Sequence, residues 1–172
     1  MRLISWNVNG IRAAAKSGLL DVLRGTGADA LCLQETRAHP DQVVSSLREP
    51  EGYSTFWAFA ERRGYSGVAL FSRVLPVEVT IGLGIPRFDA EGRVLIARYP
   101  QFLLFNVYFP NGKMNPERLQ YKMDFYEAFL SRLLVLRSRG ERIVICGDYN
   151  TAHKEIDLAH PKDNVKVSGF LP

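Results

Sequence analysis

The sequence predicts a layered α/β sandwich, and two observations support this fold class. Eight short apolar runs rich in β-branched and aromatic residues recur along the chain, each bounded by Gly, Pro, Asn or Asp, which is typical of strands. Helical patterns are interspersed among these runs, while several strands follow one another directly, as in hairpins. The 172 residues, 47% of them hydrophobic, suit one globular domain with its own core.

Two of the expected strands, at residues 31–33 and 143–146, are apolar on both faces. Strands of this kind lie in the middle of a sheet and are covered on both sides. The full set of expected strands is Leu3–Trp6, Ala30–Leu33, Tyr53–Phe59, Val68–Phe71, Val77–Ile81, Val94–Tyr99, Phe102–Phe109 and Ile143–Cys146.

The clearest helix is predicted between Asn115 and Gly140. Asn115 is a favourable N-cap, Pro116 suits the first turn, and Gly140 ends the pattern. Two further helices are expected over roughly Ile11–Leu23 and Asp41–Leu47. The apolar positions that indicate a packed face of the long helix are Leu119, Met123, Tyr126, Phe129, Leu130, Leu133 and Leu134.

Composition restricts the class of protein. The net charge of +4 weakly favours a polyanionic partner. No apolar run approaches the ~18 residues of a membrane span, and no signal peptide is visible at the N-terminus. Cys32 and Cys146 lie inside apolar runs, so we interpret them as buried small hydrophobes in a reducing cytoplasm. The chain stops at Pro172 without a closing strand or helix, from which we expect a sequence truncated at its C-terminus.

Polar side chains follow four of the expected strands. Asn7 ends the first strand, Glu35 follows the second, Tyr108 ends the seventh, and Asp148 and Asn150 follow the last. Functional sites commonly lie at strand ends in layered α/β folds, because the sheet is rigid there and the loops are open. Each residue alone has a structural explanation, as a turn former, a helix cap or a tyrosine at the edge of the core. It is their combination that predicts a site.

The combination is rich in oxygen, which is the ligand that Mg²⁺ prefers. Phosphodiester hydrolysis needs an in-line attack by water, neutralised phosphoryl oxygens and a stabilised leaving oxygen. Carboxylates, amides and a phenol together with a metal fit these needs. The sequence contains no nucleophile elbow for acyl transfer and no P-loop for nucleotide phosphates. We therefore expect a hydrolase of phosphate esters.

Several longer motifs narrow this expectation, and together they resemble the exonuclease III / abasic-site endonuclease family of the endonuclease-exonuclease-phosphatase superfamily. The resemblance covers essentially the whole chain. The motifs that carry it, in order, are Ser5–Ala13, Leu33–Arg37, Gly64–Ala69, Glu91–Val94, Tyr108–Gly112, Gly147–His153, Glu155–Asp157 and Gly169–Pro172.

The resemblance implies a four-layered α/β sandwich of the deoxyribonuclease I-like type, with residues 1–172 forming a single domain that is incomplete at the C-terminus. It implies Mg²⁺-dependent cleavage of DNA 5′ to abasic sites, with 3′–5′ exonuclease or 3′-end cleaning activity in the intact protein. Mn²⁺ is an alternative metal. The implied partner is double-stranded DNA with abasic or damaged 3′ ends, bound by a monomer that acts on the bacterial nucleoid in the cytoplasm and not at a membrane.

Residue roles follow from the same resemblance. Glu35 is expected to bind Mg²⁺ directly, with Asn7 supporting the metal site. Asp148 is expected to activate or position the attacking water, Asn150 to contact the scissile phosphate, and Tyr108 to stabilise that phosphate. Backbone contacts that hold the duplex without reading its sequence are expected from Arg12, Lys16, Tyr65, Arg93 and Asn164.

The sequence departs from the family's pattern in two respects. Asn9 stands where some relatives carry an acid near the metal, and the chain ends before the family's later Asn/Asp pair and its C-terminal Ser-Asp-His motif. We therefore expect the isolated 172 residues to be weakly active or inactive. Two other functions stay open: a truncated form that binds DNA without cutting it, and a superfamily phosphodiesterase that acts on a lipid or inositol phosphate.

Overall fold

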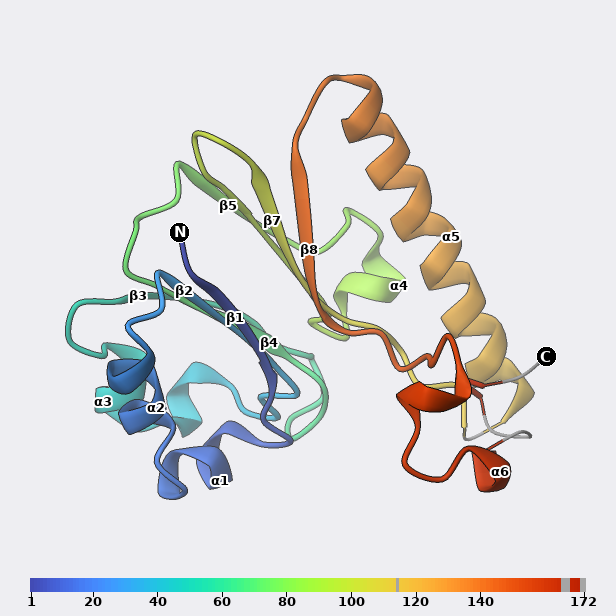
Figure 1. The fold of residues 1–172 in the computed structure, drawn as a ribbon, viewed down its shortest axis with the longest axis horizontal. Coiled ribbons are helices and arrows are strands. Elements are labelled where there is room, and N and C mark those ends of the chain that lie inside the picture. Colours follow the sequence, from blue (N-terminus) through green and yellow to red (C-terminus); the bar gives the residue numbers. More distant parts are fainter. Residues whose placement is uncertain (114, 165–167, 171–172) are drawn as a thin grey trace.

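Two four-stranded sheets pack face to face in the computed structural model, which describes residues 1–113, 115–164 and 168–170 (Figure 1). Sheet A has the strand order β1-β2-β4-β3, and sheet B has the order β5-β6-β7-β8. Helices cover the outer face of each sheet. The arrangement of helices, sheet, sheet and helices confirms the four-layered α/β sandwich that was expected.

Sheet A begins with a parallel pair of strands, β1 and β2, because the helices α1 and α2 form the crossover between them. The other pairs of this sheet, β2 with β4 and β3 with β4, are antiparallel. The elements of this half are β1 (Leu3–Asn7), α1 (Ile11–Lys16), α2 (Leu19–Thr26), β2 (Ala30–Gln34), a 3₁₀ turn η1 (Pro40–Gln42), α3 (Ser45–Arg48), β3 (Ser54–Ala58) and β4 (Val68–Ser72).

Sheet B has the same kinds of strand pair in the opposite order along the chain. Two antiparallel pairs, β5 with β6 and β6 with β7, precede a parallel pair, β7 with β8, whose crossover is the long helix α5. Its elements are β5 (Glu78–Ile81), α4 (Pro86–Asp89), β6 (Val94–Arg98), β7 (Leu103–Tyr108), α5 (Pro116–Ser138) and β8 (Ile143–Asp148). A 3₁₀ turn η2 (Glu155–Asp157) and α6 (Pro161–Asn164) follow.

Three apolar clusters hold the layers together. One lies between sheet A and its helices and includes Ile11, Leu23 and Phe71. A second lies between sheet B and α5 and is rich in phenylalanine. The third fills the space between the two sheets with smaller side chains such as Cys32 and Leu95. Burial of this apolar surface is the main term that stabilises the sandwich.

Buried polar contacts cross the mostly apolar interface between the sheets. The Ser72 and Tyr99 hydroxyl oxygens lie 2.6 Å apart at one place, and Gln34 pairs with Asn106 nearer the end of β2. Gln34, the last residue of β2, donates its Nε2 to Asn106 Oδ1 on β7 at 2.8 Å. Asn106 in turn donates its Nδ2 to the carbonyl oxygens of Leu33 (3.2 Å) and Ala69 (2.8 Å) in sheet A. Both side chains are buried. Buried polar groups are costly unless they are paired, so this contact favours one relative position of the two sheets.

All eight expected strands are present, but two of the expected helices differ. The region 11–23 forms two helices, because Gly18 adopts a left-handed conformation with φ of 93° and breaks the helix. The region 41–47 contains the short elements η1 and α3 rather than one helix. The long helix is confirmed: the Asn115 Oδ1 accepts a hydrogen bond from Arg118 N at 2.8 Å, and Gly140 follows its end at φ of 79°.

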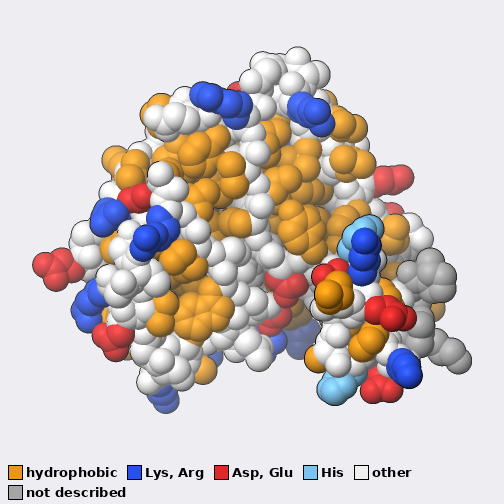
Figure 2. All heavy atoms as spheres, in the orientation of Figure 1, with side chains coloured by type: hydrophobic (Ala, Val, Ile, Leu, Met, Phe, Trp, Pro, Cys, Tyr) orange, Lys and Arg blue, Asp and Glu red, His pale blue; other side chains and the backbone are white. Residues whose placement is uncertain are grey.

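The prediction that β8 lies in the middle of a sheet is wrong for the part of the chain that the structure describes. β8 is the edge strand of sheet B, and Val144 is 37% exposed. Three apolar positions of the long helix, Met123, Leu130 and Leu134, are also exposed. Figure 2 shows apolar side chains gathered on this face of the molecule. An apolar pattern predicts which faces avoid water, but it does not say whether the covering partner lies within the same chain.

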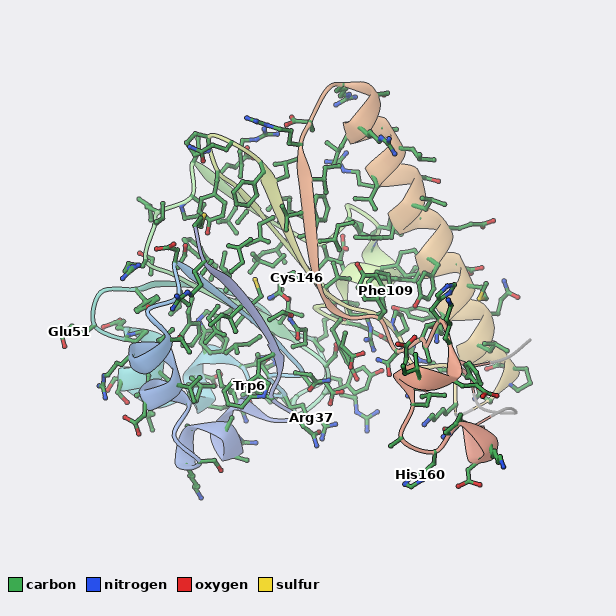
Figure 3. All side chains as sticks on the ribbon, viewed as in Figure 1. Trp6, Arg37, Glu51, Phe109, Cys146 and His160 are labelled. Carbon is green, nitrogen blue, oxygen red and sulfur yellow. The ribbon has the colours of Figure 1, made fainter. Side chains whose placement is uncertain are left out.

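Both cysteines are free thiols; Cys32 is buried and Cys146 partly buried. Cys146 points from β8 toward sheet A, whereas Phe109 lies on the opposite side, toward α5 (Figure 3). Within the described ranges, no helix has the length and apolar character needed to cross a membrane.

Replacement of Asn106 by leucine is expected to lower the free energy of unfolding by about 3 kcal/mol. The substitution keeps the shape of the side chain but removes the acceptor of one Gln34 hydrogen bond and the side-chain donor to the Leu33 and Ala69 carbonyl oxygens. Each buried group left unsatisfied costs about 1–3 kcal/mol. Urea denaturation measures the change. Gln101→Leu, at an exposed turn, serves as the control and is expected to change stability by less than about 0.5 kcal/mol. Equal stability of the two variants would contradict the role of Asn106.

Candidate active site

Four strand ends meet at one edge of the sandwich. In sheet A, Asn7 of β1 lies beside Gln34 of β2, and Glu35 follows directly. In sheet B, Tyr108 of β7 lies beside Asp148 of β8. Because both pairs are parallel, their carboxyl ends lie at the same edge. The face-to-face packing of the sheets then brings the two pairs together, and Figure 2 shows acidic side chains in the hollow at this edge.

Asn7 connects the two sheets at this point. Its Nδ2 donates to Glu35 Oε1 at 3.1 Å and to Asp148 Oδ2 at 2.7 Å. Its Oδ1 accepts a hydrogen bond from the backbone N of Asn9 at 3.0 Å, which orients the amide. One side chain therefore holds two carboxylates close together, one from each sheet. Carboxylates brought together in this way repel each other unless a donor or a cation lies between them.

Glu35 stays ionised in this setting. Burial acts to raise the pKa of Glu35, but hydrogen bonding with Tyr108 and Asn7 and the charge of Arg37 outweigh it, so the pKa is lowered. Arg37 Nη2 lies 2.5 Å from Glu35 Oε2. Burial and the neighbouring Glu35 raise the pKa of Tyr108 far above its ordinary value. At neutral pH the site therefore presents an anionic glutamate beside a protonated phenol.

Asp148 is the last residue of β8, and Asn150 lies on the tight turn that follows. Asp148 Oδ1 accepts a hydrogen bond from the backbone N of Asn150 at 2.8 Å. Asn150 Nδ2 donates to the carbonyl oxygen of Phe109 at 2.9 Å, and Phe109 N donates to Asp148 O at 2.9 Å. Gly147 precedes the turn at φ of 142°, where an added Cβ would lie 1.8 Å from Val107 O. Only glycine fits there, and the close approach of β7 and β8 keeps Tyr108 next to Asp148.

Backbone strain is concentrated at this edge. Among the described residues, those other than glycine with positive φ are Asn9, Glu35, Arg37, Ser66 and Asn150. Glu35, at φ of 54°, and Asn150, at 50°, carry side chains of the site itself. Such conformations cost on the order of 1–3 kcal/mol each and persist where the surroundings fix them. The strain therefore coincides with the residues whose orientation the site requires.

A buried ionic cluster lies behind Tyr108. Arg93 donates its Nε to Glu91 Oε2 (2.6 Å), its Nη1 to the Tyr108 carbonyl oxygen (2.9 Å) and its Nη2 to the Tyr65 hydroxyl (3.0 Å). Arg118, in the first turn of α5, donates to both Glu91 oxygens at 2.6 and 2.7 Å and to the Tyr65 hydroxyl at 3.0 Å. The cluster ties Tyr65, Tyr108 and the start of α5 to one carboxylate.

The sequence matches a known family along almost the entire chain, from residue 4 to residue 170. The chain belongs to the Endonuclease/Exonuclease/phosphatase family. The match confirms the superfamily that the sequence motifs predicted, and the paired carboxylates at the strand ends are this member's candidate active site.

Individual relatives of the chain within this family are named as nucleases. The chain is 43% identical over 171 residues to an exodeoxyribonuclease of Bacillus subtilis and 41% identical over 174 residues to the DNA repair nuclease APEX1 of Danio rerio, covering 99% and 100% of this chain. An AP endonuclease from Archaeoglobus fulgidus superposes with a TM-score of 0.83 at 29% identity over 98% of the chain. A 3′-5′ exonuclease from Neisseria meningitidis has the same TM-score at 27% identity over 95% of the chain. The chain spans between 56% and 66% of the length of these four proteins.

The structure brings together the five residues that were predicted at the centre of the site, namely Asn7, Glu35, Tyr108, Asp148 and Asn150. The expectation that Arg93 lies along the DNA backbone is wrong for this structure. Arg93 is only 2% exposed, and its guanidinium is already engaged by Glu91, Tyr65 and Tyr108. Its hydrogen bonds hold the Tyr108 backbone and the Tyr65 hydroxyl from behind. Pairing with Glu91 offsets part of the cost of burying its charge.

The other residues predicted to contact DNA lie at different places around the site. Arg12 and Lys16 are exposed on α1, on the sheet A side. Tyr65 is half-buried between the two arginines of the ionic cluster. Asn164 ends α6 on the sheet B side, where it donates to the His160 carbonyl oxygen at 2.6 Å. Asn164 also lines a pocket of about 400 Å³ that it shares with Asp148 and Asn150.

Sequence reasoning missed several residues of the site. Arg37 and Asn111 were inside quoted motifs but received no role; Arg37 pairs with Glu35, and Asn111 Nδ2 lies 3.4 Å from Asn150 Oδ1. Glu91 was also inside a motif, and its pairing with two arginines needs three-dimensional contacts to be seen. Nothing in the sequence pattern indicated a role for Lys122, because the helical pattern between Asn115 and Gly140 identifies only apolar positions.

The donor set suits a hard cation that takes few protein ligands. Across residues 1–113, 115–164 and 168–170, no three His, Cys, Asp or Glu side chains form a metal-binding group. Glu35 and Asp148 nevertheless offer two carboxylates linked by Asn7. Magnesium is commonly held by one or two carboxylates and completed by water and substrate phosphate, so these residues fit Mg²⁺.

Glu91→Gln is expected to lower the free energy of unfolding by about 3 kcal/mol at neutral pH, because it leaves the buried Arg93 without its counter-charge. Burial acts to raise the pKa of Glu91, but Arg118 and Arg93 outweigh it and lower this pKa below its ordinary value of 4.5. The stabilising charge is therefore fully present above that ordinary value and is lost as the pH falls through the lowered one.

Chemical denaturation at several pH values checks both parts of this prediction. The difference between wild type and Glu91→Gln should shrink as the pH falls below about 4. Glu78→Gln is the matched control, since Glu78 is 66% exposed beside Arg98, and surface pairs contribute about 0–1 kcal/mol. A stability difference that does not change with pH would show that the charge of Glu91 is not the stabilising feature.

Proposed function

We propose that this chain is the larger part of a Mg²⁺-dependent phosphodiesterase that cuts DNA 5′ to abasic sites, with 3′–5′ exonuclease or 3′-end cleaning activity in the intact protein. The supporting observation is the Asn7 amide that joins Glu35 and Asp148 across the two sheets. The names of relatives that are 41–43% identical, an exodeoxyribonuclease and a DNA repair nuclease, support DNA as the substrate.

Glu35 would bind Mg²⁺ (or Mn²⁺) directly, with Asn7 orienting the glutamate. The lowered pKa of Glu35 keeps this carboxylate ionised and therefore able to bind a cation. When bound, the metal supplies neutralisation of the phosphoryl oxygens and of the leaving oxygen. Arg37, which pairs with Glu35 Oε2, would then share this carboxylate with the metal.

Asp148 would take or orient the proton of the attacking water. One of its oxygens accepts from Asn7 and the other from the backbone of Asn150, so the carboxylate is held in one orientation. The water oxygen forms a bond to phosphorus while the bond to the leaving oxygen breaks. Tyr108 keeps its proton because its pKa is raised by burial and by Glu35, so it can donate to a phosphoryl oxygen, and Asn150 lies beside it with its amide.

Positive and polar groups on either side of the site would hold the duplex. Arg12 and Lys16 lie exposed on one side, Tyr65 lies in the ionic cluster behind Tyr108, and Asn164 lines the pocket. Contacts of this kind bind phosphates and do not read sequence. Abasic nucleotides are easier to extrude from a duplex than intact ones, which would favour damaged sites. We also propose that the protein acts as a monomer in the cytoplasm. Its two free thiols suit a reducing compartment.

The decisive test is cleavage of a duplex that carries one tetrahydrofuran abasic mimic, with Mg²⁺ and with EDTA. The protein is expressed from the complete open reading frame that contains these residues. We expect incision 5′ to the mimic that requires Mg²⁺ and falls on the order of 10²–10⁴-fold in Asp148→Asn and Glu35→Ala. Asp21→Asn and Glu51→Ala replace exposed carboxylates far from the site and should cut like wild type.

Other outcomes separate the alternatives. Tight binding of the duplex without incision would favour a DNA-binding form that does not cut. Neither binding nor incision, together with turnover of sphingomyelin or an inositol phosphate, would move the substrate to another phosphodiester. The 172-residue chain assayed alone should be weakly active or inactive, and turnover equal to that of the longer protein would contradict this expectation.

Arg12→Ala and Lys16→Ala are each expected to weaken binding of uncut duplex regardless of sequence, because each removes one phosphate contact. The slope of log Kd against log salt concentration should fall by about 1 for each substitution. Fluorescence anisotropy in EDTA measures this slope. Arg24→Ala is the control, since Arg24 lies exposed on α2 beside Asp21 and should leave the slope unchanged. An unchanged slope in all three variants would show that Arg12 and Lys16 on α1 do not contact DNA.

A further inference from the structure

A buried lysine lies directly behind the turn that carries Asp148 and Asn150. Lys122 projects from the second turn of α5 and is only 3% exposed. Its neighbours on the same face of the helix are Phe125 and Phe129, which belong to the apolar cluster under α5. A lysine at such a position is unusual, because an ammonium group is costly to remove from water unless it is paired.

Lys122 uses its ammonium group to hold the turn. Its Nζ donates to the carbonyl oxygen of Asn150 at 2.7 Å. Asn150 is the residue at φ of 50° whose backbone N donates to Asp148 and whose Nδ2 donates to Phe109 O. Fixing its carbonyl therefore fixes the peptide plane that follows the strained residue.

A second side chain of α5 acts on the same turn. Tyr126, one helical turn after Lys122, contacts the carbonyl oxygen of Tyr149 at 2.5 Å and the Thr151 hydroxyl at 2.9 Å. From the other side, Ala152 N donates to Gly169 O at 2.8 Å. An added Cβ on Gly169 would lie 2.6 Å from Asn150 O, so this carbonyl is enclosed between the lysine and the segment 168–170. The turn is thus supported on two sides.

The surroundings of Lys122 lower its pKa, so this position is costly for a charged side chain. Burial lowers the pKa of Lys122, the negative charge of Asp148 acts to raise it, and Lys113 acts to lower it. The Tyr126 ring lies 5.8 Å from its Nζ. An apolar side chain of similar length would fill the same space without the cost of burying a charge, and such replacements of buried charges are often neutral for stability. Packing alone therefore does not account for a lysine here.

We propose that Lys122 is a positioning residue for phosphodiester hydrolysis, which holds the Asn150 carbonyl and thereby orients the Asn150 amide and the Asp148 carboxylate toward the scissile phosphate. This inference rests on the proposed function. Lys122 lies behind the turn and does not touch the substrate. Its loss should slow the chemical step and leave DNA affinity intact, because small displacements of catalytic groups can cost on the order of 10²-fold in rate.

The test uses protein from the complete open reading frame and compares Lys122→Met with Lys122→Arg. Single-turnover incision of the tetrahydrofuran duplex with Mg²⁺ reports the chemical step, and anisotropy in EDTA reports the Kd. We expect Lys122→Met to slow incision on the order of 10–100-fold with a Kd within about 3-fold of wild type. Lys122→Arg should recover most of the rate, because it restores a donor of similar reach. Arg137→Met, an exposed substitution on the same helix, is the control.

Amide hydrogen exchange at residues 149–152 gives a readout that does not depend on cleavage, and Lys122→Met should exchange faster there than wild type. If wild type does not cut but Lys122→Met still exchanges faster than wild type, the proposed function is wrong. The role of Lys122 in holding the turn is then still supported. If wild type cuts, and folded Lys122→Met cuts equally fast with unchanged exchange, the role of Lys122 is wrong while the function stands. If Lys122→Met does not fold, Lys122→Gln takes its place and is judged by the same two readouts.

Discussion

The site depends on the buried hydrogen bond between Gln34 and Asn106, which joins the two sheets near the site through a mostly apolar interface. Apolar packing alone is non-directional and would tolerate small shifts of one sheet against the other. The Gln34–Asn106 pair resists such shifts, because a shift would leave buried donors and acceptors unpaired. Glu35 is the next residue after Gln34, and Tyr108 is two residues beyond Asn106. The contact that fixes the sheets therefore also fixes the distance between two groups of the site.

The same geometry explains why Asn7 can bridge Glu35 and Asp148. Each carboxylate comes from a parallel pair of strands, one in each sheet, and parallel strands end at a common edge. The strained backbone at Glu35 and Asn150 turns the side chains inward at this edge. Strain of this kind lowers stability locally, and the rest of the sandwich offsets it. The site is thus built from rigid strands at its base and from two strained residues at its rim.

Much of this could be predicted from the sequence, because the relevant signals are local. Short apolar runs bounded by turn residues identified all eight strands, and polar residues at four strand ends identified the centre of the site. The position of β8 at a sheet edge and the burial of Arg93 could not be predicted. Both depend on which distant segments come together. Lys122 shows the same limit, because a single lysine within a helical pattern is ordinarily solvent-exposed.

Most buried polar side chains in the described part of the chain gather near the site, and Ser72, which pairs with Tyr99 at the other end of the sheets, is an exception. Gln34 and Asn106 join the sheets beside it, Arg93 supports Tyr108 from behind, and Lys122 holds the Asn150 carbonyl. An apolar core would be easier to stabilise at each of these positions. Polar groups, however, restrict orientation in a way that apolar contacts do not, since hydrogen bonds require a defined geometry. The core of this protein is therefore polar where it must orient the groups of the site, and apolar where it only has to exclude water.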